Sequence, residues 1–517
     1  MPVVQQGAIN TTALIVPDVY VQIVPPQVSL LNGVATNILG IVGTATWGPV
    51  NAPVTVSGMP DFALKFGAIQ ARKYDLGTAV AASVLQGANN MRCVRVTDGT
   101  DVAASVALLD TATPTPATGA TITAKYTGSL GDQITATLSA GSQASTSKLT
   151  VAMPGQVPEV FDNIGGTGAT LWANLVTAIT NGNGPLRGPS KLITAVVGVS
   201  TAAPALAAYT LAGGTDGAAT ITGTTLVGVD VTPRTGMYAL RNTKTSIAFL
   251  ADCDTSTTWS TQEAYGLSEG TYMIGVGPSG DNIANAVTVK GTAGIDSYAF
   301  KLLFGDWIYF NDTVNKQVRL ISPQGFVAGL LANLSPEQSS LNKPLYGIVA
   351  TQRTMQQLTY SSADLQQLVS AGIDVIANPS PGGSYYAARF GHNSSSNPVT
   401  NGDNYTRMTN YIAYTLEAGM GLFVGQLQSA TKQRQAKSTI STFLDNLNKQ
   451  DMIGTSDGSL PYSVTLDSSN NPASRVALGY MQADVKVIYL SVIEKFLINV
   501  EGGQSVQIIR QGTQAAA

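Results

Sequence analysis

Apolar and polar positions follow one another in several distinct patterns along this chain, and the pattern changes at a few places. Residues 37–45 and 91–96 are short, mostly apolar runs that predict buried strands, and the apolar positions of 76–87 have helical spacing. Between them, residues 46–67 hold a Gly-Pro turn, a Pro-Val pair and an Asp-Phe pair, without histidine or cysteine. We expect residues 37–96 to form the first part of an α/β core.

The next segment, residues 97–216, is rich in threonine and poor in aromatic side chains. Its short alternating runs are separated by clusters of glycine, proline, asparagine and serine, which is typical of strands joined by turns. One helical pattern lies at 171–180, and residues 211–217 have the pattern of a strand that leads into a flexible turn. The segment therefore predicts an inserted β-sandwich or β-barrel domain.

Residues 217–385 alternate between strand and helix patterns, which favours a middle α/β domain. Strand-like runs lie at 246–252, 272–277, 307–310, 317–321, 345–350 and 373–378. Between some of them, Ser335 is followed by a proline and predicts the start of a helix. Ser361 and Asp364 have the spacing of a capping box, and Gly372 marks the end of the helix that they open.

Residues 386–500 begin with a loop rich in asparagine and serine. Two amphipathic helices follow within 404–452, and two strands are predicted at 461–467 and 483–492. This order predicts an α+β C-terminal domain, so we expect a multidomain chain of mixed α/β and α+β class.

Both ends of the chain have the pattern of extended arms, residues 1–36 and 501–517. The first holds one strand-like run at 19–24, closed by two prolines, and the second holds another at 504–511. A strand without a neighbour leaves its backbone hydrogen-bonding groups unpaired. Each arm is therefore expected either to pair back onto its own sheet or to add a strand to a neighbouring subunit.

Composition narrows the possible functions. Only 11% of the 517 residues are charged and the net charge is −3, so a large part of the surface is expected to be neutral and prone to association. The absence of Lys/Arg runs argues against nucleic-acid binding. Cys93 and Cys253 fit no disulfide or metal spacing and are predicted to be buried thiols in a reducing compartment. We predict no secretory signal at the N-terminus and no membrane span.

Candidate catalytic chemistry is sparse. The only histidine, His392, lies in a Gly/Asn/Ser loop without a nucleophile motif nearby. Residues 275–280, GVGPSG, match a dinucleotide-binding pattern with Asp296 downstream, but in a chain with 53 glycines an ordinary turn is the better interpretation. The Asp pair in residues 251–256 is interpreted as a turn after a strand. We expect no enzyme activity, no cofactor and no metal site.

Six segments, in this order, resemble the signature of contractile phage tail sheath proteins. They are GIVGTATWGPVNAPVTVSGMPDFALKFG (40–67), GTAVAASVLQGANNMRCVRV (77–96), YTLAGGTDG (209–217), SPQGFVAGLLAN (322–333), SAGIDVIANPSPGG (370–383) and DSSNNPASR (467–475). The chain departs from that family where YYAARFG (385–391) replaces a Trp-Gly-x-Arg-Thr stretch, and where Arg407 alone remains of an Arg-rich helix entry.

The resemblance implies a structural subunit that stacks in helical, hexameric rings around a tail tube and contracts to drive the tube through a host envelope. It implies a subtilisin-like middle domain without a protease site, an outward-facing inserted domain, and partners at the baseplate and tail terminator. The protein would assemble in the bacterial cytoplasm and reside in the virion. The residues exchanged between subunits would be Val19, Tyr20, Val21, Gln22 and Ile23 in the N-terminal arm, and Val506, Gln507, Ile508 and Ile509 in the C-terminal arm.

The basic cluster of the second C-terminal helix gives a further hypothesis. We expect the helices within 404–452 to face the tube, with Lys432, Arg434, Lys437 and Asp445 near the contact, the alternative being a solvated helix face. Other functions stay open: a sheath of a phage-like bacteriocin or secretion device, a non-contractile β-rich surface protein, or a nucleotide-binding enzyme.

Overall fold

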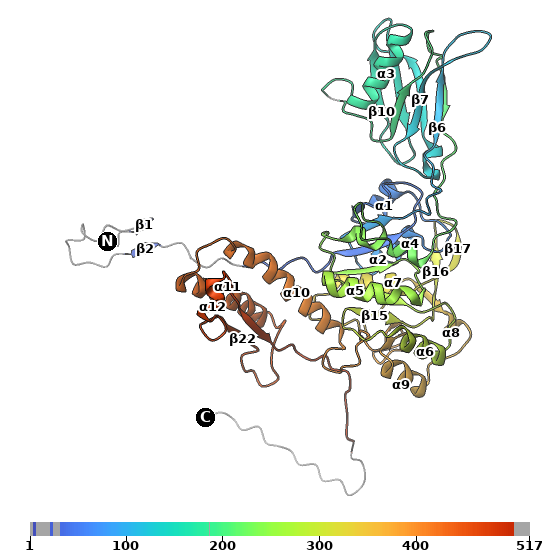
Figure 1. The fold of residues 1–517 in the computed structure, drawn as a ribbon. Coiled ribbons are helices and arrows are strands. Elements are labelled where there is room, and N and C mark those ends of the chain that lie inside the picture. The colour runs from blue at the N-terminus through green and yellow to red at the C-terminus, as the bar shows by residue number, and fades with distance from the viewer. Residues whose placement is uncertain (1–3, 7–20, 24–30, 186, 501–517) are drawn as a thin grey trace, which may run out of the picture.

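The structure, a computed structural model, describes residues 4–6, 21–23, 31–185 and 187–500 (Figure 1). Its centre is a seven-stranded sheet in which every neighbouring pair is parallel except β4 and β5. In spatial order the strands are β19 (Ile373–Asp374), β15 (Phe300–Leu303), β14 (Tyr272–Val276), β13 (Ile247–Leu250), β3 (Leu39–Gly43), β5 (Met91–Arg95) and β4 (Pro53–Val56). The predicted strands at 37–45 and 91–96 are thus confirmed, and both are buried.

Helices cover both faces of this sheet. One apolar core lies under α1 (Met59–Phe66), α2 (Leu76–Leu85) and α7 (Gln324–Asn333). The opposite face packs against α4 (Gly223–Val227), α5 (Trp259–Glu269), α6 (Ile283–Ala293), α9 (Ser362–Ser370) and the 3-10 turn η3 (Gly236–Leu240). Parallel sheets buried on both faces need such cover, and the strands accordingly have almost continuous apolar sequences.

Glycine allows α2 and α7 to approach closely. A Cβ atom on Gly329 would lie 2.6 Å from the backbone of Ser83, and one on Gly325 would lie 3.0 Å from the Cβ of Ala82. The small residues of segment 322–333 are therefore packing residues. The side chain of Leu85, the last residue of α2, is 45% exposed.

Two predictions in the middle region need correction. Strand β15 was not predicted, although it lies inside the sheet between β14 and β19. The helix expected to begin at Ser335 is absent, and residues 336 and 337 form only a turn. Arg407 donates hydrogen bonds to the backbone carbonyls of Leu334 (2.7 Å) and Ser335 (2.8 Å), and this contact fixes the turn. The capping box of Ser361 and Asp364 is confirmed.

A small antiparallel sheet, in the order β17-β16-β18, extends the core. Its strands are β16 (Ile308–Asp312), β17 (Gln317–Ile321) and β18 (Ile348–Thr351), followed by the short helix α8 (Gln352–Met355). The run predicted at 345–350 therefore begins three residues before the strand itself. A two-stranded pair, β20 (Ile376–Ala377) and β21 (Ala387–Ala388), follows β19.

Between β5 and β13 the chain leaves the central sheet and builds two antiparallel sheets that share one apolar core (Figure 1). One sheet has the order β10-β9-β8-β12 and the other β11-β7-β6. The strands are β6 (Ser105–Leu109), β7 (Thr118–Ala124), β8 (Thr135–Ala140), β9 (Ser147–Ala152), β10 (Glu159–Ile164), β11 (Ile193–Val197) and β12 (Ala208–Thr210), and α3 (Ala169–Asn181) closes the core at the predicted helix.

Arg95 holds this inserted unit to the sheet. Its buried guanidinium donates to the carbonyls of Gly48 (2.9 Å), Thr127 (2.6 Å) and Asp216 (3.2 Å), so it joins the Gly-Pro turn to the loop after β7 and to the exit of the insertion. The Asp216 carboxylate in turn accepts from Arg72 at 2.7 Å. The Gly-Pro segment near residue 48 therefore serves as a structural junction.

The C-terminal part consists of α10 (Asp403–Met420), α11 (Ala430–Lys449), α12 (Ala473–Ala477) and the antiparallel pair β22 (Tyr462–Thr465) and β23 (Asp484–Val487). The two long helices and both strands surround a fourth apolar core. The strand predicted at 483–492 ends at Val487, and the residues after it have no regular structure.

The N-terminal arm differs from the lone strand that we expected. Strand β2 (Val21–Ile23) pairs in parallel with β1 (Val4–Gln6), so the N-terminal strand has a local partner that its sequence did not reveal. Three residues are too few for a clear alternating pattern, which explains why β1 was missed. A two-stranded sheet is at best marginally stable alone.

Candidate assembly site

The sheet of β22 and β23 is the first candidate for contact with another chain. It has only two strands, and among the described residues no further strand pairs with the outer edge of either. Tyr462, Val464, Val485 and Val487 pack against the core of α10 and α11. One face of the pair is therefore anchored, while both edges present free backbone donors and acceptors.

Two asparagines set the geometry of this sheet. The Asn471 side chain is buried and acts as a backbone substitute: its amide donates to the carbonyl of Gln482 (2.8 Å) and its oxygen accepts from the Gln482 N–H (2.7 Å). Asn470 donates to the Asp484 carboxylate at 2.9 Å. The Asn-Asn-Pro segment of the sequence therefore fixes the start of β23.

Residues 488–500 form an extended apolar segment that leaves the body of the protein (Figure 1). Five large apolar side chains on it are 68–86% exposed: Ile493, Phe496, Leu497, Ile498 and Val500. Burial of each such side chain is worth about 1.5–3 kcal/mol. A run of this kind on a charge-poor chain marks a surface that gains from contact with a partner.

The N-terminal arm departs from the same part of the molecule. Leu31 packs on the C-terminal core, where a Cβ on Gly419 would lie 2.1 Å from its side chain. The N–H of Val34 donates to the Thr415 hydroxyl at 3.2 Å. The last residues before β3 therefore run along α10, and both chain ends begin at the C-terminal unit.

The structure places only part of the predicted exchange residues. Val21, Gln22 and Ile23 form β2. Val19 and Tyr20 lie outside the described residues, as do Val506, Gln507, Ile508 and Ile509. Strand exchange by these residues stays a prediction.

A buried ionic cluster connects the C-terminal helix to the central sheet. Lys301, on β15, is fully buried, and its ammonium lies 2.7 Å from the Asp374 carboxylate and 3.0 Å from that of Asp403. It also donates to the carbonyl of His392 at 2.9 Å. Asp403 is the first residue of α10, so one lysine joins the sheet, the 391–402 loop and the helix.

Hydrogen bonds satisfy the rest of the cluster. The Asp403 carboxylate accepts from the Tyr272 hydroxyl (2.6 Å), the Ser340 N–H (3.1 Å) and the Ser340 hydroxyl. That of Asp374 accepts from the N–H groups of Phe390 and Gly391, both at 3.0 Å. A buried ion pair is favourable only when its remaining polar atoms are bonded in this way.

The charges of the cluster stabilise one another. Burial by itself would raise the pKa of Asp403, but Lys301 and the hydrogen bonds from Ser340 and Tyr272 outweigh it and lower the pKa to about 2. Burial would lower the pKa of Lys301, yet the two carboxylates raise it above its ordinary value. Burial and then Asp403 raise the pKa of Tyr272, which stays neutral as a donor. Lys301 and Asp403 are therefore both ionised at neutral pH.

The predicted tube-facing residues all lie on α11 but differ in their surroundings. Arg434 is exposed, and Lys432 and Lys437 are partly exposed. Asp445 lies 2.6 Å from Lys449 and belongs to an ion pair within the helix. The opposite face of the helix is apolar and buried through Ala436, Ile440, Phe443, Leu444 and Leu447, as the periodicity predicted. The three basic side chains are thus available for a contact, whereas Asp445 already has a partner.

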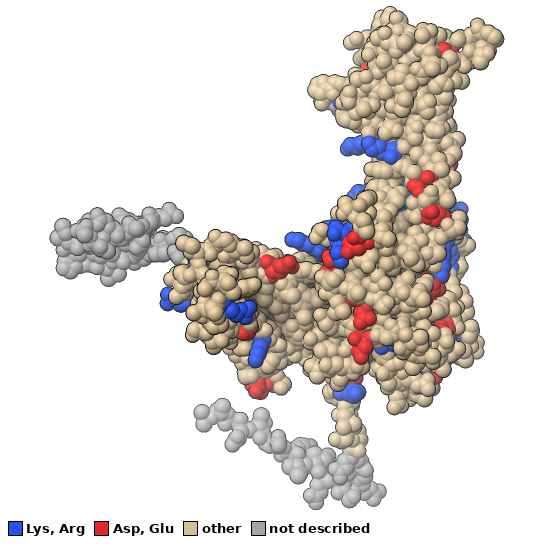
Figure 2. All heavy atoms as spheres, viewed as in Figure 1, with Lys and Arg blue, Asp and Glu red and all other residues tan. Residues whose placement is uncertain are grey.

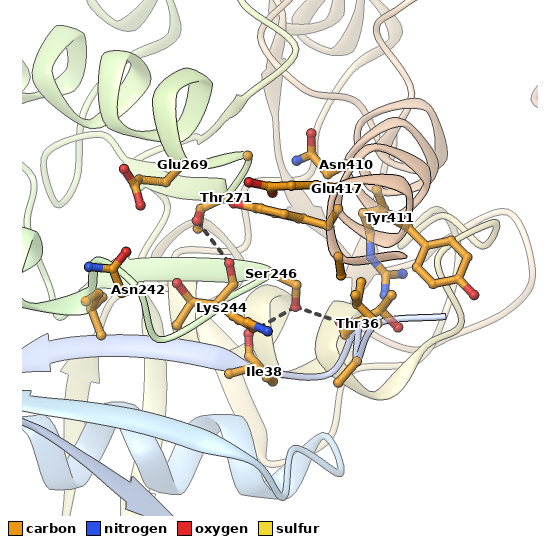
Figure 3. Close-up of a pocket in the computed structure, with 18 of the residues that line it drawn as sticks. Thr36, Ile38, Asn242, Lys244, Ser246, Glu269, Thr271, Asn410, Tyr411 and Glu417 are labelled. Atoms are coloured by element: carbon orange, nitrogen blue, oxygen red, sulfur yellow. Dashed lines mark hydrogen bonds between the residues drawn. The ribbon is translucent and has the colours of Figure 1, made fainter. Parts of the chain in front are cut away.

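A cleft of about 690 Å³ separates α10 from the central sheet over part of their boundary (Figure 3). Its floor is the segment before β3, which is tied to the sheet because the Ser246 hydroxyl donates to the carbonyls of Thr36 (2.7 Å) and Ile38 (3.0 Å). Glu269 and Glu417 line its walls. Hydrogen bonds between α10 and the middle region are made by the N-terminal part of the helix, through Asp403, Thr406 and Arg407.

The residues of the candidate nucleotide-binding and metal-binding motifs make structural contacts within the fold. Gly275 of the GVGPSG segment faces Phe300, whose ring would lie 2.2 Å from an added Cβ, and Asp296 bonds Ser396. Asp252 accepts from the Ser322 N–H (2.9 Å), and Asp254 pairs with Lys73 at 2.9 Å. Cys93 and Cys253 are buried free thiols, as predicted, and no group of three metal-binding side chains occurs within the described ranges.

Charged side chains are sparse on the face shown in Figure 2, most clearly over the inserted unit of β6–β12. This agrees with the neutral surface expected from composition. In the part of the chain that the structure describes, no helix has both the length and the apolar character to cross a membrane.

No family model and no curated protein matches this sequence. Its fold, in contrast, matches solved sheath structures over most of the chain. A sheath tail protein from Listeria innocua aligns with a TM-score of 0.60 at 12% identity, covering 89% of this chain and 96% of that one. A sheath tail protein from Desulfitobacterium hafniense gives 0.55 at 14% identity, covering 87% and 94%. The contracted helical sheath of the anti-feeding prophage gives 0.55 at 10% identity, covering 94% and 99%.

The chain therefore has the mixed α/β, multidomain fold of tail sheath proteins, which also occurs in the sheaths of phage-like contractile injection systems. The resemblance found in six short sequence segments is confirmed at the level of the fold. Those proteins are structural components of sheath assemblies.

Sequence reasoning missed the Lys301 cluster and the exposed segment 488–500. Lysine inside the short run FKLL gave no sign of burial, since its partners lie 73 and 102 residues away. The apolar run at 488–500 was visible, but its first part was assigned to a strand.

Proposed function

We propose that this protein is the structural subunit of a contractile sheath, which polymerises as helical rings around an inner tube and contracts to drive that tube through a host envelope. The match of its fold to sheath proteins over nearly the whole chain carries the proposal. The proposal includes a subtilisin-like layering of the middle region without protease activity, and a β-sandwich for the outward-facing insertion.

The assembly contacts follow from the open edges and the exposed segment. Residues 495–500, together with the arm after them, would lie against the β22–β23 sheet of a neighbour, and the N-terminal arm would occupy another edge. Backbone pairing would provide the hydrogen bonds of the shared sheet, and these bonds would persist during subunit rotation if the arms act as hinged tethers. Large rigid-body rotations are then possible while the subunits stay tethered.

The first test is electron microscopy of the purified full-length chain at high concentration. We expect hollow, striated cylinders, because each subunit carries both a donor segment and an acceptor sheet. Monodisperse particles under all assembly conditions would contradict the proposal.

The partners would be further copies of this chain, a tube protein, a baseplate and a tail terminator, with no cofactor. Such a particle would assemble in a bacterial cytoplasm and reside in a virion tail. The same fold serves phage-like injection systems, so a sheath of such a device is the second candidate.

Charge reversal on α11 tests the tube contact. We expect Lys432→Glu, Arg434→Glu and Lys437→Glu together to prevent co-assembly with tube, because a basic helix face would become acidic. Cosedimentation of sheath with preformed tube measures this. The matched control exchanges Lys73 and Asp254, an ion pair outside α11, which preserves their pairing. Unchanged cosedimentation of the triple variant would remove α11 from the tube interface.

A further inference from the structure

We propose that His392 and Glu494 form a pH-sensitive clamp that fixes where the C-terminal segment leaves the protein. The His392 Nε2 atom lies 2.8 Å from a carboxylate oxygen of Glu494. His392 is the only histidine of the chain, and this contact lies two residues before the exposed apolar run that begins at Phe496.

The chain before Glu494 crosses the N-terminal part of α10 as a strap, residues 488–494. The Ile488 N–H donates to the carbonyl of Pro461 at 2.7 Å, and the carbonyl of Leu490 accepts from Asn404 at 3.2 Å. The Tyr489 hydroxyl lies 3.2 Å from that of Thr409. These three contacts join neutral groups. The contact between His392 and Glu494, in contrast, becomes an ion pair when the imidazole is protonated.

The contact between His392 and Glu494 is partly shielded from solvent. Its side chain is only 11% exposed, while that of Glu494 is 41% exposed. Its backbone carbonyl accepts from Lys301 of β15, whose charge is opposed by Asp374 and Asp403 of the buried cluster.

The remaining charged neighbours lie along the chain. Arg389 precedes His392 by three residues, and Lys495 follows Glu494 on the strap. The buried cluster has one cation and two carboxylates, so the charges named around the imidazole balance, and Glu494 is the carboxylate in direct contact with it.

The direction of the pH effect follows from the charges of His392 and Glu494. Histidine side chains exchange a proton between about pH 5 and 8. With the imidazolium form, the contact is an ion pair; with the neutral form, it is a single hydrogen bond. The clamp is therefore strongest on the acid side of the histidine titration and weakens as pH rises through it. That the released segment serves subunit assembly rests on the proposed function, whereas the clamp itself is a property of one chain.

The test uses the full-length protein with ¹³C-labelled histidine, which gives a single imidazole signal. We expect Glu494→Gln to move the titration midpoint of that signal to lower pH by about 0.5 unit, because an adjacent anion is lost. Lys495→Gln, a neighbouring exposed charge, is the matched control and is expected to leave or slightly raise the midpoint. Equal midpoints for wild type and Glu494→Gln would overturn the proposal.

Hydrogen exchange measured by mass spectrometry provides the second reading. We expect protection of amides 489–494, corrected for intrinsic rates, to fall about two- to fivefold between pH 5.5 and 8, the range of a partly exposed ion pair. Glu494→Gln should remove this pH dependence. Protection that stays constant in wild type would overturn the clamp even if the full-length chain forms cylinders, so failure here is distinguishable from failure of the sheath proposal.

Discussion

Replacing Lys301 with methionine is expected to destabilise the protein by about 3–5 kcal/mol, since two carboxylates would be left in a dry interior without a counter-charge. Asp374 and Asp403 both lie within 3.0 Å of the ammonium, and all three side chains are fully buried. Methionine has nearly the same length as lysine and fills the same space. The loss of stability therefore reports the missing charge rather than a packing defect. Chemical denaturation, together with hydrogen exchange of the peptides covering β15, measures this loss in the free energy of unfolding.

Lys73→Met is the matched control. Lys73 pairs with Asp254 at 2.9 Å, but its side chain is 44% exposed, so its loss is expected to cost less than about 1 kcal/mol. Adding Asp374→Asn and Asp403→Asn to Lys301→Met should restore part of the stability, because the uncompensated charges disappear. Equal effects of Lys301→Met and Lys73→Met would show that the cluster does not hold α10 to the sheet.

The cluster also predicts how stability depends on acid. The pKa of Asp403 is lowered in the folded protein to about 2, whereas an unfolded aspartate titrates at about 3.9. Its contribution is therefore complete above about pH 4 and is lost as pH falls through about 2.

Replacing Phe496, Ile498 and Val500 together with serine is expected to abolish polymerisation while leaving the subunit folded. These side chains are 68–86% exposed in the single chain, so their replacement costs the monomer little. In a polymer each would bury apolar area worth about 1.5–3 kcal/mol, and every subunit would lose all three contacts. Sedimentation velocity and far-UV circular dichroism measure assembly and folding separately.

Replacing Val157, Val196 and Val199 together with serine provides the control. The side chains of these three valines of the inserted unit are 69–86% exposed. That variant is expected to assemble normally, because the insertion is proposed to face outward. Normal cylinders from the Phe496, Ile498 and Val500 variant would exclude this segment from the subunit contacts.

Local sequence signals predicted the elements whose stability is local. The Ser361 capping box, the apolar face of α11 and the buried run of β5 all appear where periodicity and capping rules place them. The helix expected at Ser335 failed because Arg407, over seventy residues away, holds the carbonyls of Leu334 and Ser335 in a turn. A tertiary contact here outweighs a local start signal.

The candidate site was predictable only in outline. The pattern indicated strands at the chain ends and a basic helix, but β1 was missed. β15 was missed because it is four residues long and contains Lys301. No local rule can show that a lysine is buried, since its burial depends on carboxylates supplied by β19 and α10. The open edges of β22 and β23 likewise become visible only once all their pairings are known.

The most direct measurement is a helical reconstruction of the assembled cylinders by cryo-electron microscopy, at a resolution that traces the backbone. The proposal predicts that residues after Glu494 of one subunit lie as an added strand on the β22–β23 sheet of a neighbour. Cylinders in which each segment folds back onto its own subunit, with both sheet edges free of neighbouring strands, would contradict it.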